Sequence, residues 1–143
     1  MAEAIASVFG IITFVTQIGV RLFELREFYK QVKSAPSDIE TLLSDCERLD
    51  RALDGLKLQC RQIASLGIPN TVYNECLDSC GTALRKLESV AAELRSGMSK
   101  SKFMGSLEAF LRKDEVCKQK EQLRTAKVDV LFASQILSKS VHI

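Results

Sequence analysis

The residues of this chain best suited to chemistry are five cysteines and a single histidine, His142. No two cysteines form a CxxC pair, and Cys76 and Cys80, four residues apart, would share one face of a helix rather than make a zinc knuckle. One histidine does not supply a Cys/His zinc site. We therefore expect no metal, and we expect reduced thiols packed as small apolar side chains in a cytoplasmic protein. The cysteines are Cys46, Cys60, Cys76, Cys80 and Cys117.

Motifs for nucleotide binding or covalent catalysis are absent from the sequence. It contains no GxGxxG, no P-loop and no GxSxG nucleophile elbow. The carboxylate pairs Asp45/Glu47 and Asp114/Glu115 are interpreted as solvated charge on exposed helix faces. We predict a protein that is not an enzyme and that takes no cofactor.

Charge is distributed unevenly along the chain. Residues 34–94 carry six basic and ten acidic side chains, whereas residues 95–127 carry nine basic and four acidic ones. This basic stretch is a candidate surface for acidic partners or anionic lipid, and a solvated helix face is the alternative. Nucleic-acid binding is not favoured, because no aromatic side chains for base stacking alternate with the basic ones. The candidate basic surface consists of Lys113, Lys118, Lys120, Arg124 and Lys127.

The elements that would position these side chains are helices. Apolar residues recur at alternating spacings of three and four, and Pro36, Gly67, Pro69 and the Ser-rich stretch 96–101 mark the breaks. The pattern predicts one all-α domain over residues 1–143, an antiparallel four-helix bundle with an additional short helix. The second and third helices, joined by a short turn, are expected to form an antiparallel hairpin. The predicted helices span residues 2–33, 36–66, 70–96, 102–112 and 114–138.

The first helix differs from the others because residues 4–20 carry no charge and are apolar almost all the way round. As a helix this segment would rise about 25 Å, less than the ~30 Å hydrocarbon core of a bilayer. We expect it to be the central core helix of the bundle, and release to a membrane is the alternative. The candidate membrane or effector residues are Ala6, Phe9, Gly10, Ile11, Ile12, Phe14, Val15, Ile18 and Gly19.

Three stretches carry a resemblance to a known family: AEAIASVFGIITFVTQIGV, SAPSDIETLLSDCERLDRALDGL and FLRKDEVCKQKEQLRTAKVDVLFASQIL. Together they resemble the fungal N-terminal helical domain that precedes NTPase modules of NOD-like (STAND) receptors or ankyrin repeats. This domain is also known as the azaphilone pigment cluster protein L N-terminal domain, and it is close to the HeLo-like group.

The resemblance implies a signalling or effector bundle. In HeLo-like relatives the N-terminal helix is associated with membrane targeting and cell death during non-self recognition. The alternative is a protein-interaction or accessory module of a secondary-metabolite gene cluster, without a catalytic role. The partners expected are a protein or a second copy of the chain, with membrane contact only on activation.

Overall fold

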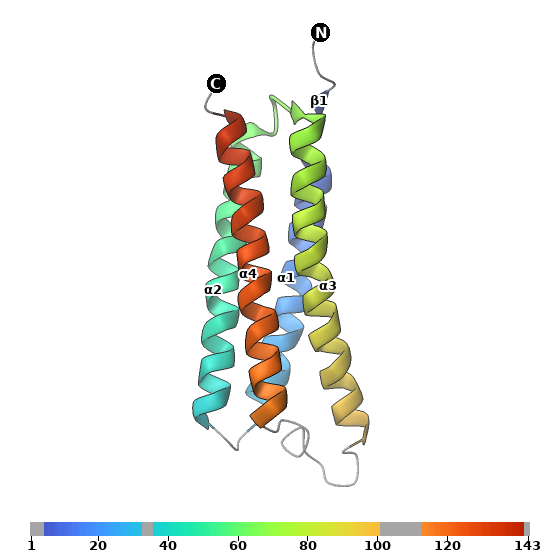
Figure 1. Cartoon of the computed structure of the whole chain (residues 1–143), viewed down its shortest axis with the longest axis vertical. Coiled ribbons are helices and arrows are strands. Elements are labelled where there is room, and N and C mark those ends of the chain that lie inside the picture. The colour runs from blue at the N-terminus through green and yellow to red at the C-terminus, as the bar shows by residue number, and fades with distance from the viewer. Residues whose placement is uncertain (1–4, 33–35, 101–112, 142–143) are drawn as a thin grey trace.

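The computed structural model describes residues 5–32, 36–100 and 113–141, and in this part of the chain the fold is all-α, as predicted. The described residues form four long helices, which lie side by side (Figure 1). They are α1 (Phe9–Lys30), α2 (Pro36–Ile63), α3 (Asn70–Lys100) and α4 (Lys113–Val141). Two very short strands, β1 (Ile5–Ala6) and β2 (Ile68–Pro69), pair antiparallel at one end of the helices.

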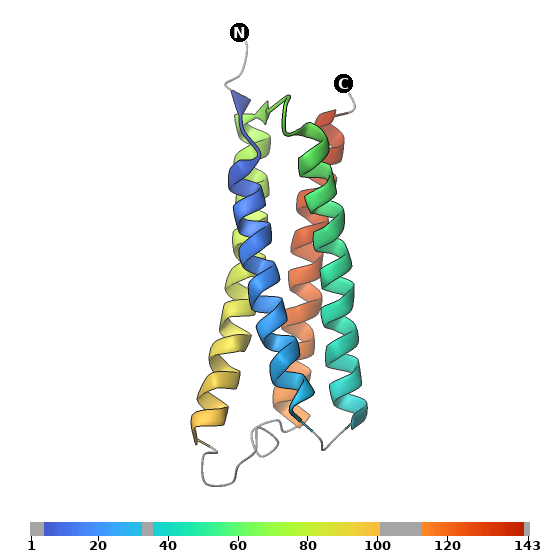
Figure 2. The ribbon, with the colours of Figure 1, turned by 180° about the vertical axis from the view of Figure 1, so that it is seen from behind.

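Each helix packs against two neighbours. The extensive contacts join α1 to α2 and α3, and join α4 to α2 and α3. Helices α2 and α3 therefore face each other across a diagonal, as Figure 2 also shows, and the predicted hairpin between them is wrong. The connection between them, residues 64–69, first closes α2 with a turn and then runs extended through β2 at the end of the helices.

The core is built from the predicted apolar stripes. The eight apolar residues that recur at spacings of three and four along α2 are all buried, and six residues of the corresponding stripe of α4 are buried as well. In α3 the stripe is buried from Cys80 onward, while Tyr73 and Leu77 are partly buried against the core. The stripe of α2 consists of Ile39, Leu42, Cys46, Leu49, Leu53, Leu56, Cys60 and Ile63, and that of α4 of Val116, Leu123, Ala126, Val130, Ala133 and Leu137.

The start of the first helix was predicted too early. Ala6 lies in β1, where it pairs with Ile68, and α1 begins only at Phe9. The backbone N–H of Phe9 donates to Ser7 Oγ at 3.3 Å, so a serine oxygen takes up one of the free donors at this helix end. Pairing with β2 thus outweighs the helix propensity of the alanine-rich start.

Gly67 makes this strand pairing possible. Its φ is +71°, and a Cβ at this position would lie 2.4 Å from Ile5 Cγ2. Its N–H also bonds to the carbonyl oxygen of Ile63 at 3.2 Å, as expected for a left-handed residue that closes a helix. The prediction that Gly67 marks a break between two helices is confirmed.

The remaining boundaries differ modestly from expectation. Helix α2 ends at Ile63 rather than at residue 66, α3 continues four residues beyond 96, and α4 runs from Lys113 to Val141. Helix ends are the least determined part of a sequence pattern, because the spacing of apolar residues does not mark where a helix stops. The predicted short helix over residues 102–112 lies outside the described residues.

The first helix does not occupy the centre of the molecule, contrary to the prediction. Helix α1 contacts α2 and α3 with one side, and the other side faces solvent (Figure 2). Four helices packed as neighbours around a shared core leave no position that is surrounded on all sides. An almost wholly apolar helix in such an arrangement must therefore expose part of its apolar surface.

Candidate functional site: the outer face of helix α1

The inner row of α1 holds the helix in place. Its six side chains are at most 3 % exposed and repeat at spacings of four and three. The candidate residues Ile11, Val15 and Ile18 belong to this row, so they are core residues and are not accessible to a partner. The inner row consists of Ile11, Val15, Ile18, Leu22, Leu25 and Tyr29.

The flank of α1 towards α3 is also closely packed. The ring of Tyr73 from α3 lies directly against Gly10, where an added Cβ would meet the Tyr73 hydroxyl, so a larger residue here would force this side chain to move. One turn further on, Phe14 is partly buried near Gly81, where an added Cβ would lie 3.7 Å from Phe14 Cζ. Gly10 and Phe14 are therefore packing residues between α1 and α3.

The outer face of α1 is apolar and exposed. Phe9, Val20 and Phe23 are 68 %, 59 % and 64 % exposed, and the uncharged Thr13 and Thr16 lie between them on the same side of the helix. The candidate residues Ile12 and Gly19 border this face and are half-buried. Three large exposed apolar side chains on one helix face form the kind of surface that marks an interaction site.

A groove runs along each side of this face. The groove between α1 and α2 encloses about 310 Å³, and Val20 and Phe23 line it together with Asp50, Asp54 and Lys57 of α2. The groove towards α3 encloses about 290 Å³. Volumes near 300 Å³ lie at the lower limit for small-molecule sites, so each groove is better suited to side chains of a docked surface.

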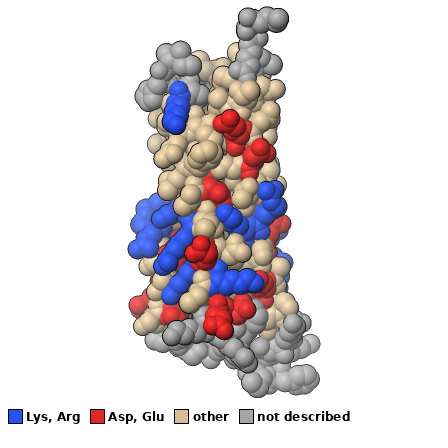
Figure 3. Space-filling model, viewed as in Figure 1, with Lys and Arg blue, Asp and Glu red and all other residues tan. Residues whose placement is uncertain are grey.

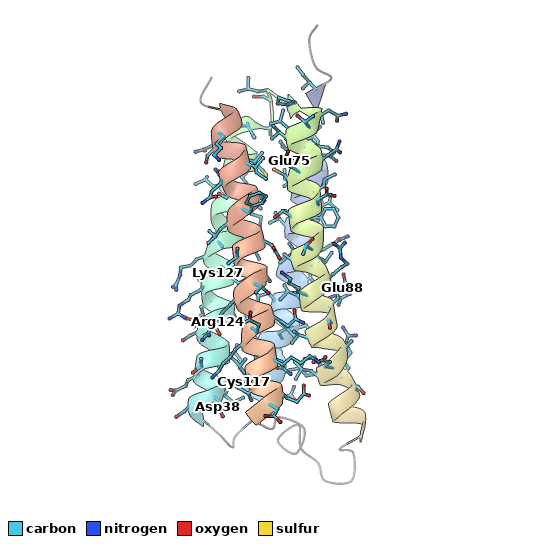
Figure 4. The ribbon with its side chains drawn as sticks, viewed as in Figure 1. Asp38, Glu75, Glu88, Cys117, Arg124 and Lys127 are labelled. Carbon is cyan, nitrogen blue, oxygen red and sulfur yellow. The ribbon has the colours of Figure 1, made fainter. Side chains whose placement is uncertain are left out.

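The candidate basic surface on α4 is largely paired. Lys118 Nζ lies 2.6 Å from Glu93, which raises the lysine pKa, while Lys120 and Arg124 lie 3.8 Å and 3.7 Å from carboxylates of α2. Lys127 makes no ion pair with any residue the structure describes, and it projects from α4 on the side of α2 (Figure 4). The side chain of Lys113 lies outside the described part.

Basic side chains do not form a continuous field on this side of the molecule. Figure 3 shows Lys and Arg side chains as a band across the lower half of the face, with Asp and Glu side chains among them. The ion pairs join α4 to α2 and α3, so these charges hold neighbouring helices together. Exposed pairs of this kind contribute roughly 0–1 kcal/mol each.

The thiols are free in the described residues, and four of the five are buried. Burial raises the pKa of Cys46 to about 12 and that of Cys60 to about 11. The pKa of Cys76 and of Cys80 rises to about 12, chiefly for the same reason. Such thiols stay protonated and are poor nucleophiles. Only Cys117, near the start of α4 (Figure 4), is exposed.

A polar cluster in the core was missed by the sequence reasoning. The Tyr29 hydroxyl donates to Gln119 Oε1 at 2.7 Å, and both side chains are fully buried. Asp45 was predicted to be solvated but is only 4 % exposed, with Arg48 at 3.3 Å. Asp45 stands three residues after Leu42, and Gln119 stands three residues after Val116, so their helical spacing already placed both on the buried stripes.

Other kinds of site receive no support from the described residues. Within them no group of three or more His, Cys, Asp or Glu side chains could hold a metal ion. None of the helices in the described part combines the length and the apolar character needed to cross a membrane. Comparison of the chain with protein-family models, curated proteins and solved structures finds no match.

Proposed function

We propose that this chain is an antiparallel four-helix bundle that serves as a non-catalytic interaction domain, with the outer face of α1 as its docking surface for a protein. The neighbour contacts support the bundle, because α1–α2, α2–α4, α4–α3 and α3–α1 close a ring of four helices. The observation that carries the function is the exposure of Phe9, Val20 and Phe23 on one uncharged helix face.

The outer face has the features of a protein-binding surface. Aromatic side chains such as Phe9 and Phe23 are enriched at protein interfaces, where burial of a large apolar area contributes to affinity. Charged side chains of α2, Asp54 and Lys57 among them, lie along the rim of the adjoining groove. An apolar centre with a charged rim is the usual organisation of such interfaces.

Site-specific photo-crosslinking in cells tests this function. A photoreactive phenylalanine analogue at Phe23 is expected to give discrete protein adducts, because this side chain would be covered by the partner. The same analogue at Phe132, an exposed aromatic residue on α4, provides the control. Adducts of equal yield and pattern at both positions, or none at Phe23, would contradict the proposal.

A second candidate function is conditional action of α1 on a membrane. The absence of charge from Phe9 to Val20 and the resemblance to HeLo-like domains favour it. Release of α1 would expose six buried side chains. Burial of each such side chain stabilises the fold by about 1.5–3 kcal/mol, so the release would cost on the order of 10 kcal/mol of folding free energy. That cost is comparable with the whole stability of a typical domain, so this function requires a strong trigger.

Vesicle leakage distinguishes the two candidates. The membrane function predicts that a dye is released from vesicles of anionic lipid by the wild-type protein but not by Val20→Glu. The interaction function predicts no release by either protein. Val20 suits this test because its side chain is 59 % exposed, and a glutamate can therefore replace it without disturbing the core.

A further inference from the structure

We propose that the docking partner of the outer face of α1 is a second copy of this chain, bound antiparallel so that α1 packs on α1 and α2 on α2 of the other copy. This inference rests on the proposed function, since it names the occupant of the same face. It follows from the charge order along α2, beside that face.

Four charged residues form one row on α2 next to the α1–α2 groove. Asp50, Asp54, Lys57 and Arg61 are spaced by four, three and four residues, which places them on the same side of the helix. Asp54 and Arg61 are exposed, and Asp50 and Lys57 are half-buried. Asp50 also lies 3.6 Å from Arg26 of α1, so the row begins at the border between the two helices.

This row is complementary to itself in the antiparallel direction. Its two acidic residues come first and its two basic residues last, so a reversed copy faces Asp50 with Arg61 and Asp54 with Lys57. Both pairings share one midpoint, between Asp54 and Lys57, as a twofold axis requires. A parallel arrangement would instead place the charged row of α2 against the apolar face of α1.

The same axis brings apolar surface together on α1. Helices α1 and α2 run in opposite directions (Figure 2), and Thr16 and Gly19 line the groove together with Asp54 and Lys57. The axis therefore crosses α1 near Thr16, and Phe23 of one copy meets the segment from Phe9 to Ile12 of the other. Small residues at the axis and aromatic residues at both ends suit close contact between two helices.

The expected complex is a weak, reversible dimer. Along α1 the face from Phe9 to Phe23 is about 20 Å long, and two adjoining helices give it a similar width. An interface of this extent lies at the small end of specific protein contacts. Association is therefore measured by sedimentation equilibrium between about 1 µM and about 500 µM, a range matched to weak binding.

A pair of matched valines tests the surface. Val20 on α1 and Val128 on α4 are both 59 % exposed, and α4 lies diagonally opposite α1. Val20→Glu is expected to leave the protein monomeric over the whole range, whereas Val128→Glu dimerises like the wild type. Circular dichroism verifies that both variants remain folded. A wild-type protein that stays monomeric, or equal loss in both variants, would overturn the proposal.

Exchange of charges tests the antiparallel register. Asp54→Lys places a lysine opposite Lys57 of the other copy, and Lys57→Asp places an aspartate opposite Asp54 of the other copy. Each single change is expected to weaken dimerisation about tenfold or more, because like charges face each other twice. The double variant Asp54→Lys/Lys57→Asp restores the pairing and the affinity. Failure of the double variant to recover would overturn the antiparallel arrangement.

The crosslink at Phe23 separates this inference from the proposed function. An adduct of twice the mass of the chain supports self-docking. An adduct with a different protein, and no self-adduct, overturns the second copy as occupant while the interaction function stands. Binding to lipid vesicles through Phe23 without any protein adduct overturns both.

Discussion

The buried hydrogen bond between Tyr29 and Gln119 offers a quantitative test of how α1 is held in the core. It joins α1 to the diagonally opposite helix α4, with the hydroxyl oxygen 2.7 Å from Gln119 Oε1. The amide nitrogen of Gln119 has no hydrogen-bond partner among the described residues. Burial raises the pKa of Tyr29 well above 10, so the phenol remains a donor at every pH of interest.

Removal of one side chain of this hydrogen bond should lower the free energy of unfolding more than removal of both. Tyr29→Phe leaves a fully buried amide without its partner, and Gln119→Leu leaves a buried hydroxyl without one. Each single change is expected to lower the free energy of unfolding by about 1–3 kcal/mol. The double variant replaces both polar groups by apolar ones, and its stability is expected within about 1 kcal/mol of the wild type.

Urea unfolding of the four proteins at neutral pH measures this double-mutant cycle. The dependence of unfolding free energy on urea must be the same in all four for the comparison to be valid. Strictly additive single effects would show that the two side chains do not interact. A cost below about 0.5 kcal/mol for Tyr29→Phe would refute the reasoning, because the hydroxyl would then not satisfy a buried amide.

Three further predictions concern packing and protonation. Gly10→Ala should destabilise the protein by about 1–3 kcal/mol in urea unfolding because its Cβ would meet Tyr73, whereas Gly19→Ala, with open space around it, should stabilise it by about 0.5–1 kcal/mol. Gly67→Ala should cost about 1–2 kcal/mol or more from its positive φ, and a gain in melting temperature would contradict this. The four buried thiols bind their protons more tightly in the folded than in the unfolded protein, so the free energy of unfolding should fall as the pH rises above about 9. Cys117, the exposed thiol, should be the only cysteine that reacts with a thiol reagent before the protein unfolds. An unfolding free energy that rises between pH 7.5 and pH 9.5, or rapid modification of more than one thiol, would contradict the last prediction.

The candidate site residues predicted on α1 fall into two groups in the structure, one buried in the core and one exposed to solvent. Periodicity identified the residues of α1 that are apolar, but residues 4–20 are apolar on nearly every side, so it did not indicate which row would be buried. Packing against α2 and α3 selected the row that contains Ile11 and Ile18. Phe9 was left in solvent, as was Phe23, which the sequence reasoning did not include.

The surroundings of the charged residues likewise could not be predicted from the sequence pattern. The basic surface was predicted from a count of side chains along the chain, and a count does not include neighbours. In the structure Lys118, Lys120 and Arg124 each lie next to an acidic residue of α2 or α3. Asp45 was assigned to the surface because of its charge, although its spacing from Leu42 and Leu49 placed it on the buried stripe.

The amino-acid sequence by itself determined the all-α class, the four long helices and the buried stripes of α2 and α4. These features are local, because a spacing of three and four residues produces one apolar row on a helix whatever lies opposite it. Only the tertiary structure decided that α2 and α3 are diagonal, that residues 5–6 pair with residues 68–69, and that α1 exposes one apolar face. Those outcomes depend on contacts between distant segments, and the stripes of single helices do not specify which helices become neighbours.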